Sequence, residues 1–187
     1  MKLIGLCGAA GAGKDTAARL LPFRSIAFAD QLYLEVSRAF DVPIAWMKRR
    51  EVKDSPQSIM ALQWGPLDFA AFNPEVDIRY PQTPRKILQR WADWRRADDP
   101  EYFVRKTEET IKWYSHVTVT DVRFANEVAL IRRYGGQIWQ IVRPGVTAGG
   151  TGHVSDTDGS QFSPDIIIDN SGNLSELREK VLAAYGR

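Results

Sequence analysis

The sequence predicts an α/β fold, with a parallel β-sheet of about five strands flanked by helices. Three observations support this prediction. Short apolar and β-branched runs alternate with amphipathic stretches along the chain, which is typical of parallel strands joined by helical crossovers. A glycine-rich loop directly follows the first apolar run and precedes a helical stretch. Finally, 187 residues with 44% hydrophobic side chains can bury one substantial core.

Each expected strand comes from an apolar or β-branched run. The strands are predicted at residues 2–7, 24–28, 116–120, 137–142 and 165–168. The longer helices follow from periodic apolar positions and from residues that start or stop helices. They are predicted at residues 14–21, 30–40, 84–96, 99–114, 126–134 and 174–185. Pro84 favours the first turn of its helix, and Gly135 with Gly136 favours the end of another.

Two long stretches lack a regular pattern. Residues 42–84 contain six prolines, so we expect short helices and loops there. Residues 143–163 contain five glycines and are predicted to form a long loop. We expect a single domain, residues 1–187. Its core should comprise residues 1–41 and 116–187, with residues 42–115 as a helical insertion that binds substrate or acts as a lid.

Composition argues against several classes of protein. No apolar run reaches the length of a transmembrane helix, and the first residues are too rich in glycine for a secretory signal, so we expect no membrane partner. The single cysteine, Cys7, excludes an internal disulfide and is typical of a reducing cytosol. We therefore expect a cytoplasmic protein in which Cys7 is a core residue at the end of a strand.

The net charge is only +2, but the charges are unevenly distributed. Residues 85–96 carry five basic side chains and one acidic one, whereas residues 144–177 contain no Lys or Arg. A second basic cluster consists of Lys48, Arg49, Arg50 and Lys53. A basic middle region favours an anionic substrate at that part of the chain.

The most specific motif is Gly8-x4-Gly13-Lys14, which follows the first strand and opens a helix. Glycines let the backbone approach a phosphate closely, successive N–H groups form an anion-binding nest, and the lysine adds a positive charge. The motif predicts a site for the phosphates of a nucleotide. The predicted nucleotide-binding residues here are Gly8, Ala9, Ala10, Gly11, Ala12, Gly13, Lys14, Asp15 and Thr16.

The candidate metal ligands are Asp15, Thr16 and Asp121. Asp15 occupies the position where Ser or Thr usually places a hydroxyl on Mg²⁺. Either Thr16 makes the metal contact instead, or Asp15 acts through a water, or Asp15 simply favours the first turn of its helix. Asp121 directly follows the third predicted strand, which is where many phosphoryl-transfer enzymes place the acidic residue that supports the metal.

Two more candidate residues follow strand ends, where ligands bind in parallel sheets. Asp30 can accept a proton from a substrate hydroxyl or orient a metal-bound water, and it is equally suited to cap the following helix. Arg123 can reach a phosphate, the alternative being a surface ion pair with Asp121.

The basic helix predicted at residues 84–96 contains two tryptophans. Trp91 shares an apolar stripe with Ile87 and Leu88, which predicts a core position. Trp94, Arg95 and Arg96 are therefore the better candidates for a substrate-binding or lid face, because arginine matches phosphate geometry and aromatic rings stack on bases. The alternative is a solvated basic helix.

Taken in order along the chain, the motifs resemble those of the phage deoxynucleoside monophosphate kinase family. The matching segments are Gly8-x4-Gly13-Lys14-Asp15-Thr16, Phe28-Ala-Asp30, Leu88-Gln89, Asp99-Pro100-Glu-Tyr-Phe103, Asp121-Val-Arg123-Phe-x-Asn-Glu127, Arg143-Pro144-Gly145 and His153-x-Ser155-Asp156. The sequence departs from the family at Ala92-Asp93-Trp94 and at Asp156, in the substrate region.

The resemblance implies a P-loop kinase fold, ATP with Mg²⁺, and a deoxynucleoside monophosphate as acceptor. It implies that Lys14 holds the donor phosphates, that the arginines neutralise charge, and that Asn170 lies at the donor base. The predicted catalytic residues are Lys14, Asp30, Arg95 and Arg123. The predicted substrate-binding residues are Asp30, Trp94, Arg95, Arg96, Asp121 and Arg123.

Other functions stay open at this point. Related phage P-loop kinases phosphorylate the hydroxymethyl group of 5-hydroxymethyluracil in duplex DNA, during thymidine hypermodification. In that case Asp30 would be the base and the basic clusters would form a DNA groove. Dephospho-coenzyme A kinases are also similar. A non-catalytic, nucleotide-dependent DNA-binding module would bind ATP without turnover. The sequence also leaves a homodimer open.

Overall fold

The computed structural model describes residues 1–146 and 162–186. The chain divides into two compact units. The first, here called the core unit, contains Met1–Phe28 and Val104–Arg187, and the second, the insert unit, contains Ala29–Phe103. The predicted His153-x-Ser155-Asp156 motif and most of the predicted 143–163 loop lie outside the described residues.

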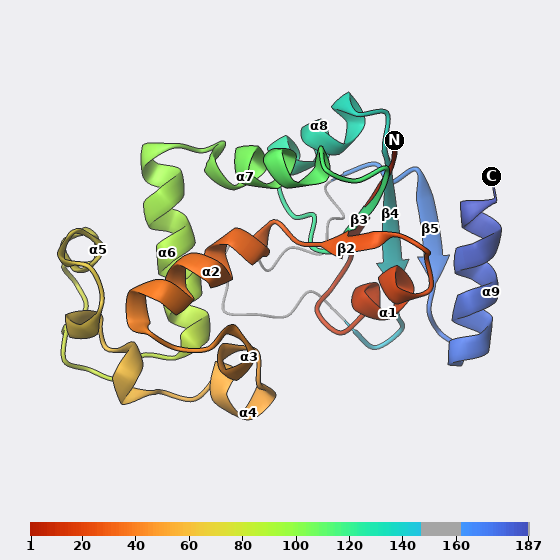
Figure 1. Ribbon diagram of the computed structural model, residues 1–187. Coiled ribbons are helices and arrows are strands. Elements are labelled where there is room, and N and C mark those ends of the chain that lie inside the picture. Colours follow the sequence, from red (N-terminus) through yellow and green to blue (C-terminus); the bar gives the residue numbers. More distant parts are fainter. Residues whose placement is uncertain (147–161, 187) are drawn as a thin grey trace. The chain divides into compact units, whose positions relative to one another are not determined.

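The described part of the core unit contains a five-stranded parallel sheet (Figure 1). Its strands are β1 (Lys2–Cys7), β2 (Arg24–Ile26), β3 (His116–Val119), β4 (Gln137–Val142) and β5 (Ile166–Asp169). Their order across the sheet is β2-β3-β1-β4-β5, and every neighbouring pair is parallel. The predicted parallel α/β sheet is therefore confirmed, with β1 at its centre.

Helices cover the sheet because successive strand side chains point to opposite faces. The helices of this unit are α1 (Lys14–Arg19), α8 (Ala125–Arg133), α9 (Leu174–Tyr185) and the part of α7 (Tyr102–Ile111) that begins at Val104. Leu3 and Cys7 pack in one buried cluster with residues of α7 and α8. Ile4 and Leu6 pack in another with residues of α1 and α9. Cys7 is fully buried, as predicted.

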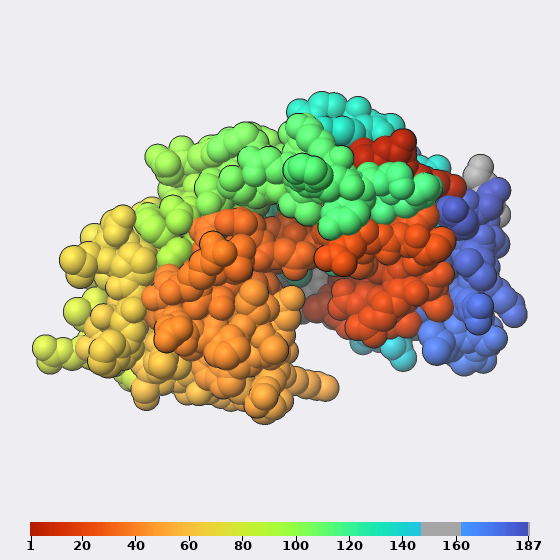
Figure 2. Space-filling model, viewed as in Figure 1, coloured from red at the N-terminus to blue at the C-terminus, as the bar shows by residue number. Residues whose placement is uncertain are grey.

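The insert unit is helical and has its own core. It contains α2 (Ala29–Phe40), α3 (Ile44–Met47), α4 (Arg50–Lys53), the short 3-10 turns Ser58–Met60 and Leu62–Trp64, α5 (Leu67–Phe72) and α6 (Pro84–Asp98). The segments from α2 to α5 form its orange and yellow surface (Figure 2). Phe40, Phe69 and Trp91 meet in its core. Trp91 is only 2% exposed, which confirms its predicted core position.

Element boundaries differ from prediction where local hydrogen bonds decide them. The predicted helix from residue 99 begins at Tyr102 instead, because the carboxylate of Asp99 accepts the N–H of Glu101 and forms a turn first. The helix predicted to end at Leu21 ends at Arg19, and Leu20 serves as its C-cap. In the part of the chain that the structure describes, no helix is long and apolar enough to span a membrane.

Candidate functional site

The loop between β1 and α1 has a backbone that only glycine tolerates at three positions. Gly8, Gly11 and Gly13 have φ values of 134°, 85° and 102°, all in the left-handed region. A Cβ at Gly8 would also collide with the carbonyl oxygen of Ile141. The loop is therefore fixed against β4 as well as by its own sequence, which is what a preformed phosphate-binding loop requires.

The ammonium of Lys14 lies inside this loop. Its Nζ donates hydrogen bonds to the carbonyl oxygens of Gly8 and Ala9, at 2.7 and 2.8 Å. Burial lowers the pKa of this ammonium and the Arg123 guanidinium lowers it further, whereas the carboxylates of Asp15 and Asp121 act in the opposite direction. Arg123, Asp15 and Asp121 therefore lie close enough to Lys14 to act on its charge, although β3 is far from the loop in sequence.

A turn after β3 carries Asp121 and Arg123. The Oδ1 of Asp121 accepts the backbone N–H of Phe28 at 2.7 Å. The Oε2 of Glu127 accepts the backbone N–H groups of Arg123 and Phe124, at 2.6 and 3.0 Å. Glu127 is only 3% exposed, so a buried carboxylate fixes the turn. Sequence reasoning gave Glu127 no role, although an acid at the third position of a helix is a known capping signal.

Asn170 ties the end of β5 to the phosphate loop. Its Nδ2 donates to the carbonyl oxygen of Ala12 at 2.8 Å, and its backbone N–H donates to the carbonyl oxygen of Val142 at 2.7 Å. A Cβ at Gly13 would collide with the Asn170 amide. The side chain is buried, so it supports the loop from behind; its predicted place at a donor base remains a prediction.

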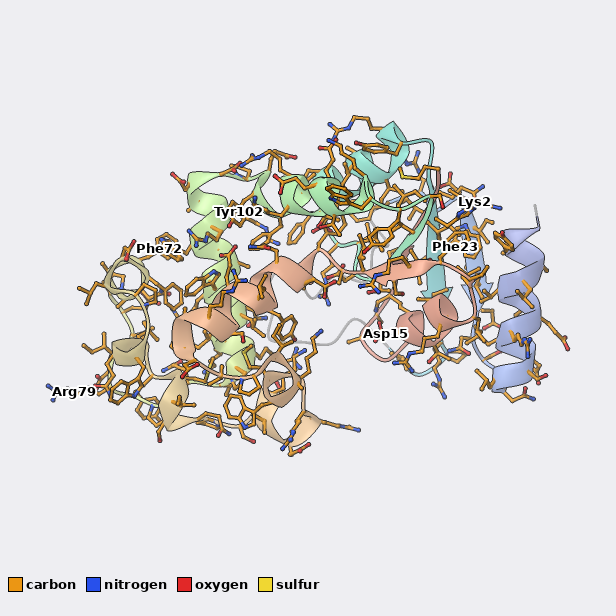
Figure 3. All side chains as sticks on the ribbon, in the orientation of Figure 1. Lys2, Asp15, Phe23, Phe72, Arg79 and Tyr102 are labelled. Atoms are coloured by element: carbon orange, nitrogen blue, oxygen red, sulfur yellow. The ribbon has the colours of Figure 1, made fainter. Side chains whose placement is uncertain are left out.

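The predicted metal ligands suit a magnesium ion that shares its coordination with phosphates. Asp15 is exposed at the start of α1 (Figure 3), and Thr16 is partly buried one residue later. No group of three or more His, Cys, Asp or Glu side chains within residues 1–146 and 162–186 is arranged to hold a metal. Mg²⁺ needs no such cage, because it commonly binds one or two carboxylates together with substrate phosphates. Asp15, Thr16 and Asp121 carry oxygen groups of the kind that Mg²⁺ prefers, and they stay predicted ligands.

The remaining predicted residues belong to the insert unit. Asp30 lies in the first turn of α2, and its carboxylate is 4.0 Å from the Nζ of Lys48. Arg95 donates from Nε to the carboxylate of Glu35 at 2.8 Å. The guanidinium of Arg96 instead lies 5.2 Å from the ring centroid of Phe103. The two adjacent arginines of α6 therefore have different surroundings.

Glu35 accepts hydrogen bonds from four side chains, a role that the sequence did not predict. Besides Arg95, it accepts hydrogen bonds from Gln31 Nε2 and Trp91 Nε1, both at 2.8 Å, and from the Tyr102 hydroxyl at 2.5 Å. Its side chain is 10% exposed. Burial raises the pKa of this carboxyl, but the donated hydrogen bonds outweigh burial, and the net pKa is lowered. A single acid on an amphipathic helix gave no signal of this role.

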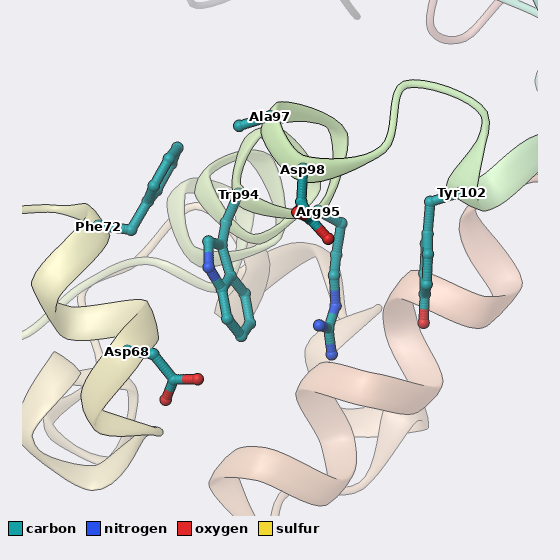
Figure 4. Close-up of a pocket in the computed structure, with 7 residues that line it drawn as sticks. All are labelled: Asp68, Phe72, Trp94, Arg95, Ala97, Asp98 and Tyr102. Atoms are coloured by element: carbon teal, nitrogen blue, oxygen red, sulfur yellow. The ribbon is translucent and has the colours of Figure 1, made fainter.

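A pocket of about 520 Å³ lies within the insert unit (Figure 4). It is lined by Asp68, Phe72, Trp94, Arg95, Ala97, Asp98 and Tyr102. The Arg95 guanidinium stands between two of the aromatic rings, 4.4 Å from the Trp94 centroid and 5.4 Å from that of Tyr102. Two predicted substrate-binding residues, Trp94 and Arg95, thus line the same cavity.

No protein-family model matches the chain. The chain is 28% identical over 204 residues to a protein of Acanthamoeba polyphaga mimivirus named "Putative deoxynucleotide monophosphate kinase", and the alignment covers 98% of this chain and 95% of that protein. A solved structure, the dephospho-CoA kinase from Campylobacter jejuni, matches with a TM-score of 0.43 at 15% identity, over 99% of this chain and 96% of that one. The predicted α/β P-loop kinase fold agrees with the sheet order and the loop between β1 and α1.

Proposed function

We propose that the protein is an ATP-dependent kinase that phosphorylates a deoxynucleoside monophosphate. The observation that carries this proposal is the grouping of Lys14, Arg123, Asp15 and Asp121 at a preformed phosphate loop. A long sequence match to a protein named as a deoxynucleotide monophosphate kinase supports the acceptor class.

In this proposal a phosphate oxygen of the acceptor attacks the γ-phosphorus of ATP, and the bond to the β,γ-bridging oxygen breaks. The products are a deoxynucleoside diphosphate and ADP. Phosphoryl transfer depends mainly on positioning and on stabilising negative charge. The loop N–H groups and Lys14 would hold the β- and γ-phosphates, and Arg123 would neutralise charge beside them.

Magnesium would supply further charge neutralisation when it is bound with the nucleotide. Thr16, Asp15 and Asp121 would hold it, directly or through water. Asp121 keeps its position because one oxygen is bonded to the backbone of Phe28. Asn170 would keep the loop in shape through its bond to Ala12.

One observation favours the second candidate, a kinase acting on 5-hydroxymethyluracil in DNA. The ammonium groups of Lys48 and Lys53 lie 4.7 and 5.9 Å from the ring centroid of Tyr33. Arg49 and Arg50 beside them are exposed. Tyr33 itself is buried in the core of the unit, so this surface offers a row of four cations, which suits a polyanion such as a nucleic-acid backbone. A hydroxyl acceptor would need a base, for which Asp30 is the candidate.

The decisive experiment offers γ-labelled ATP to two sets of acceptors. One set is the four deoxynucleoside monophosphates, and the other is duplex DNA with and without 5-hydroxymethyluracil. Label in a nucleoside diphosphate supports the proposal, and label confined to the modified DNA supports the second candidate. If ATP binds but no acceptor becomes labelled, the chain is a binding module and both proposals fail.

A further inference from the structure

We infer that the pocket of the insert unit holds the base of the acceptor, and that it prefers bases with N–H donors on their pairing edge, guanine above all. This inference rests on the proposed function, since it names the substrate class of the same enzyme. It assigns Arg95 to the base rather than to a phosphate. The residues that would recognise the base line the pocket, namely Asp68, Phe72, Trp94, Arg95 and Asp98.

The pocket has a rigid aromatic wall. Trp94 packs against Phe69 and Trp91, with ring centroids 5.5 and 5.0 Å apart. Because Phe69 is fully buried, Trp94 packs against the core of the insert unit and is fixed by it. Phe72 lines the same pocket and stands beyond Trp94 in Figure 4, with 42% of its surface exposed. Exposed aromatic surface of this kind is what a nucleobase covers when it stacks.

The charges in the pocket do not suit a phosphate group. The positive charge of Arg95 is balanced by the Glu35 carboxylate, to which its Nε donates. Asp68 and Asp98 add two carboxylates, which exceed the remaining positive charge. Both carboxylates are exposed, so they act through solvent, but their charge still disfavours a phosphate beside them, and the base of a nucleotide is the part that would enter the pocket.

The carboxylates are available to a ligand. In the described part of the chain, neither Asp68 nor Asp98 forms a hydrogen bond or an ion pair with another residue. An ionised carboxylate only accepts hydrogen bonds. A matching ligand therefore presents hydrogen-bond donors to the pocket. Among flat groups such as nucleobases, the pocket should prefer those that carry N–H groups on the edge that faces the carboxylates.

Guanine fits this pattern better than the other bases. It presents two adjacent donors, N1–H and the N2 amino group, to a carboxylate, and its O6 and N7 accept from arginine. Adenine and cytosine offer one amino group. Thymine presents N3–H between two carbonyl oxygens, which a carboxylate repels. The volume of about 520 Å³ is within the range of small-molecule sites.

The experiment measures binding of deoxynucleoside monophosphates without ATP, by calorimetry. The wild-type protein should bind dGMP at least about tenfold more tightly than dTMP, the scale of one charge-assisted hydrogen bond. The double variant Asp68→Asn/Asp98→Asn should lose most of this preference, because each amide lacks the negative charge and one of the two acceptor oxygens of the carboxylate. Phe72→Ala should lower the affinity for all four deoxynucleoside monophosphates by a similar factor, about tenfold. Asp77→Asn is the matched control, because Asp77 is exposed in the same unit and only caps the N–H of Arg79.

Several outcomes would overturn the inference. Equal affinity for dGMP and dTMP, no binding at millimolar concentrations, or an unchanged preference in the double variant would each do so. Tighter binding of 5-hydroxymethyl-dUMP than of dGMP would also do so. The test separates the two proposals. Selective binding of dGMP without transfer to any acceptor would refute only the kinase, whereas transfer without base selection would refute only the pocket.

Discussion

The core unit and the insert unit offer different chemical groups to a ligand. In the core unit, the phosphate loop uses backbone groups, held in place by left-handed glycines and by the buried Asn170. In the insert unit, the pocket uses side chains, mainly aromatic rings and carboxylates on α5 and α6. A backbone site suits a group common to all nucleotides, and a side-chain site suits the group that distinguishes them.

The largest effect should come from Lys14→Ala. Removing this ammonium takes a fixed cation from the transferred group, so we expect kcat/KM for phosphoryl transfer to fall by about 10³-fold or more. Binding of dGMP without ATP should stay within about twofold of wild type, because Lys14 is not part of the insert unit. Steady-state kinetics and calorimetry measure the two quantities.

Lys112→Ala is the matched control for this variant. Lys112 is an exposed lysine of the core unit that pairs with Glu108 at 3.5 Å, away from the loop. Its kinetics should match those of wild type. Near-normal transfer by Lys14→Ala would show that the phosphate loop does not carry the reaction.

The next largest effect should be on stability, from Glu35→Gln. The neutral amide leaves Arg95 without its counter-charge. It also points its own NH2 group at hydrogen-bond donors such as the Tyr102 hydroxyl. We therefore expect the free energy of unfolding to fall by about 2–3 kcal/mol. Denaturant unfolding measures it. Glu75→Gln should change stability little, because the pair that Glu75 forms with Arg90 is exposed. If Glu35→Gln lowers the free energy of unfolding no more than Glu75→Gln does, the hydrogen bonds to Glu35 do not stabilise the wall of the pocket.

Asn170→Ala should lower the stability of the core unit by a moderate amount. It leaves the carbonyl of Ala12 without its partner, at an expected cost of about 1–2 kcal/mol. Because the loop loses a support, KM for ATP should rise while binding of dGMP stays the same. Ser171→Ala, which removes an exposed hydroxyl from the next position, is the control. If both variants have the same KM for ATP, Asn170 does not position the loop.

The pH dependence of stability should also differ between wild type and Glu35→Gln. The pKa of Glu35 is lowered below its ordinary 4.5 in the folded protein, by hydrogen bonds that outweigh burial. The contribution of Glu35 to the free energy of unfolding is therefore fully present above the pKa that Glu35 has in the unfolded chain. It is lost as the pH falls through the lower pKa that Glu35 has in the folded protein. The difference in unfolding free energy between the two proteins should be constant above about pH 5.5 and shrink toward pH 3. A difference that grows on acidification would contradict the lowered pKa.

The two units also differ in how much could be predicted from sequence. Gly8, Gly13 and Lys14 form a local motif, and Asp121 follows a clear strand, so the loop and its neighbours were predictable. Glu35 and Asp98 gave no such signal. Their roles depend on which faces of α2, α5 and α6 meet, and irregular residues 42–84 set that packing. Tertiary contacts between helices do not follow from periodicity alone.

The smallest effect, on nucleotide acceptors, should come from Asp30→Asn. A monophosphate already carries its attacking oxygen as an anion and needs no base, so kcat for dGMP should change by less than about twofold. A hydroxyl acceptor must lose a proton, and its rate should fall by about 10²-fold or more if Asp30 is the base. Asp41→Asn serves as the control, because Asp41 lies beyond the other end of α2 and its φ of 51° is one that Asn tolerates. Equal losses with both acceptors would give Asp30 a positional role, in which its contact with Lys48 orders the start of α2.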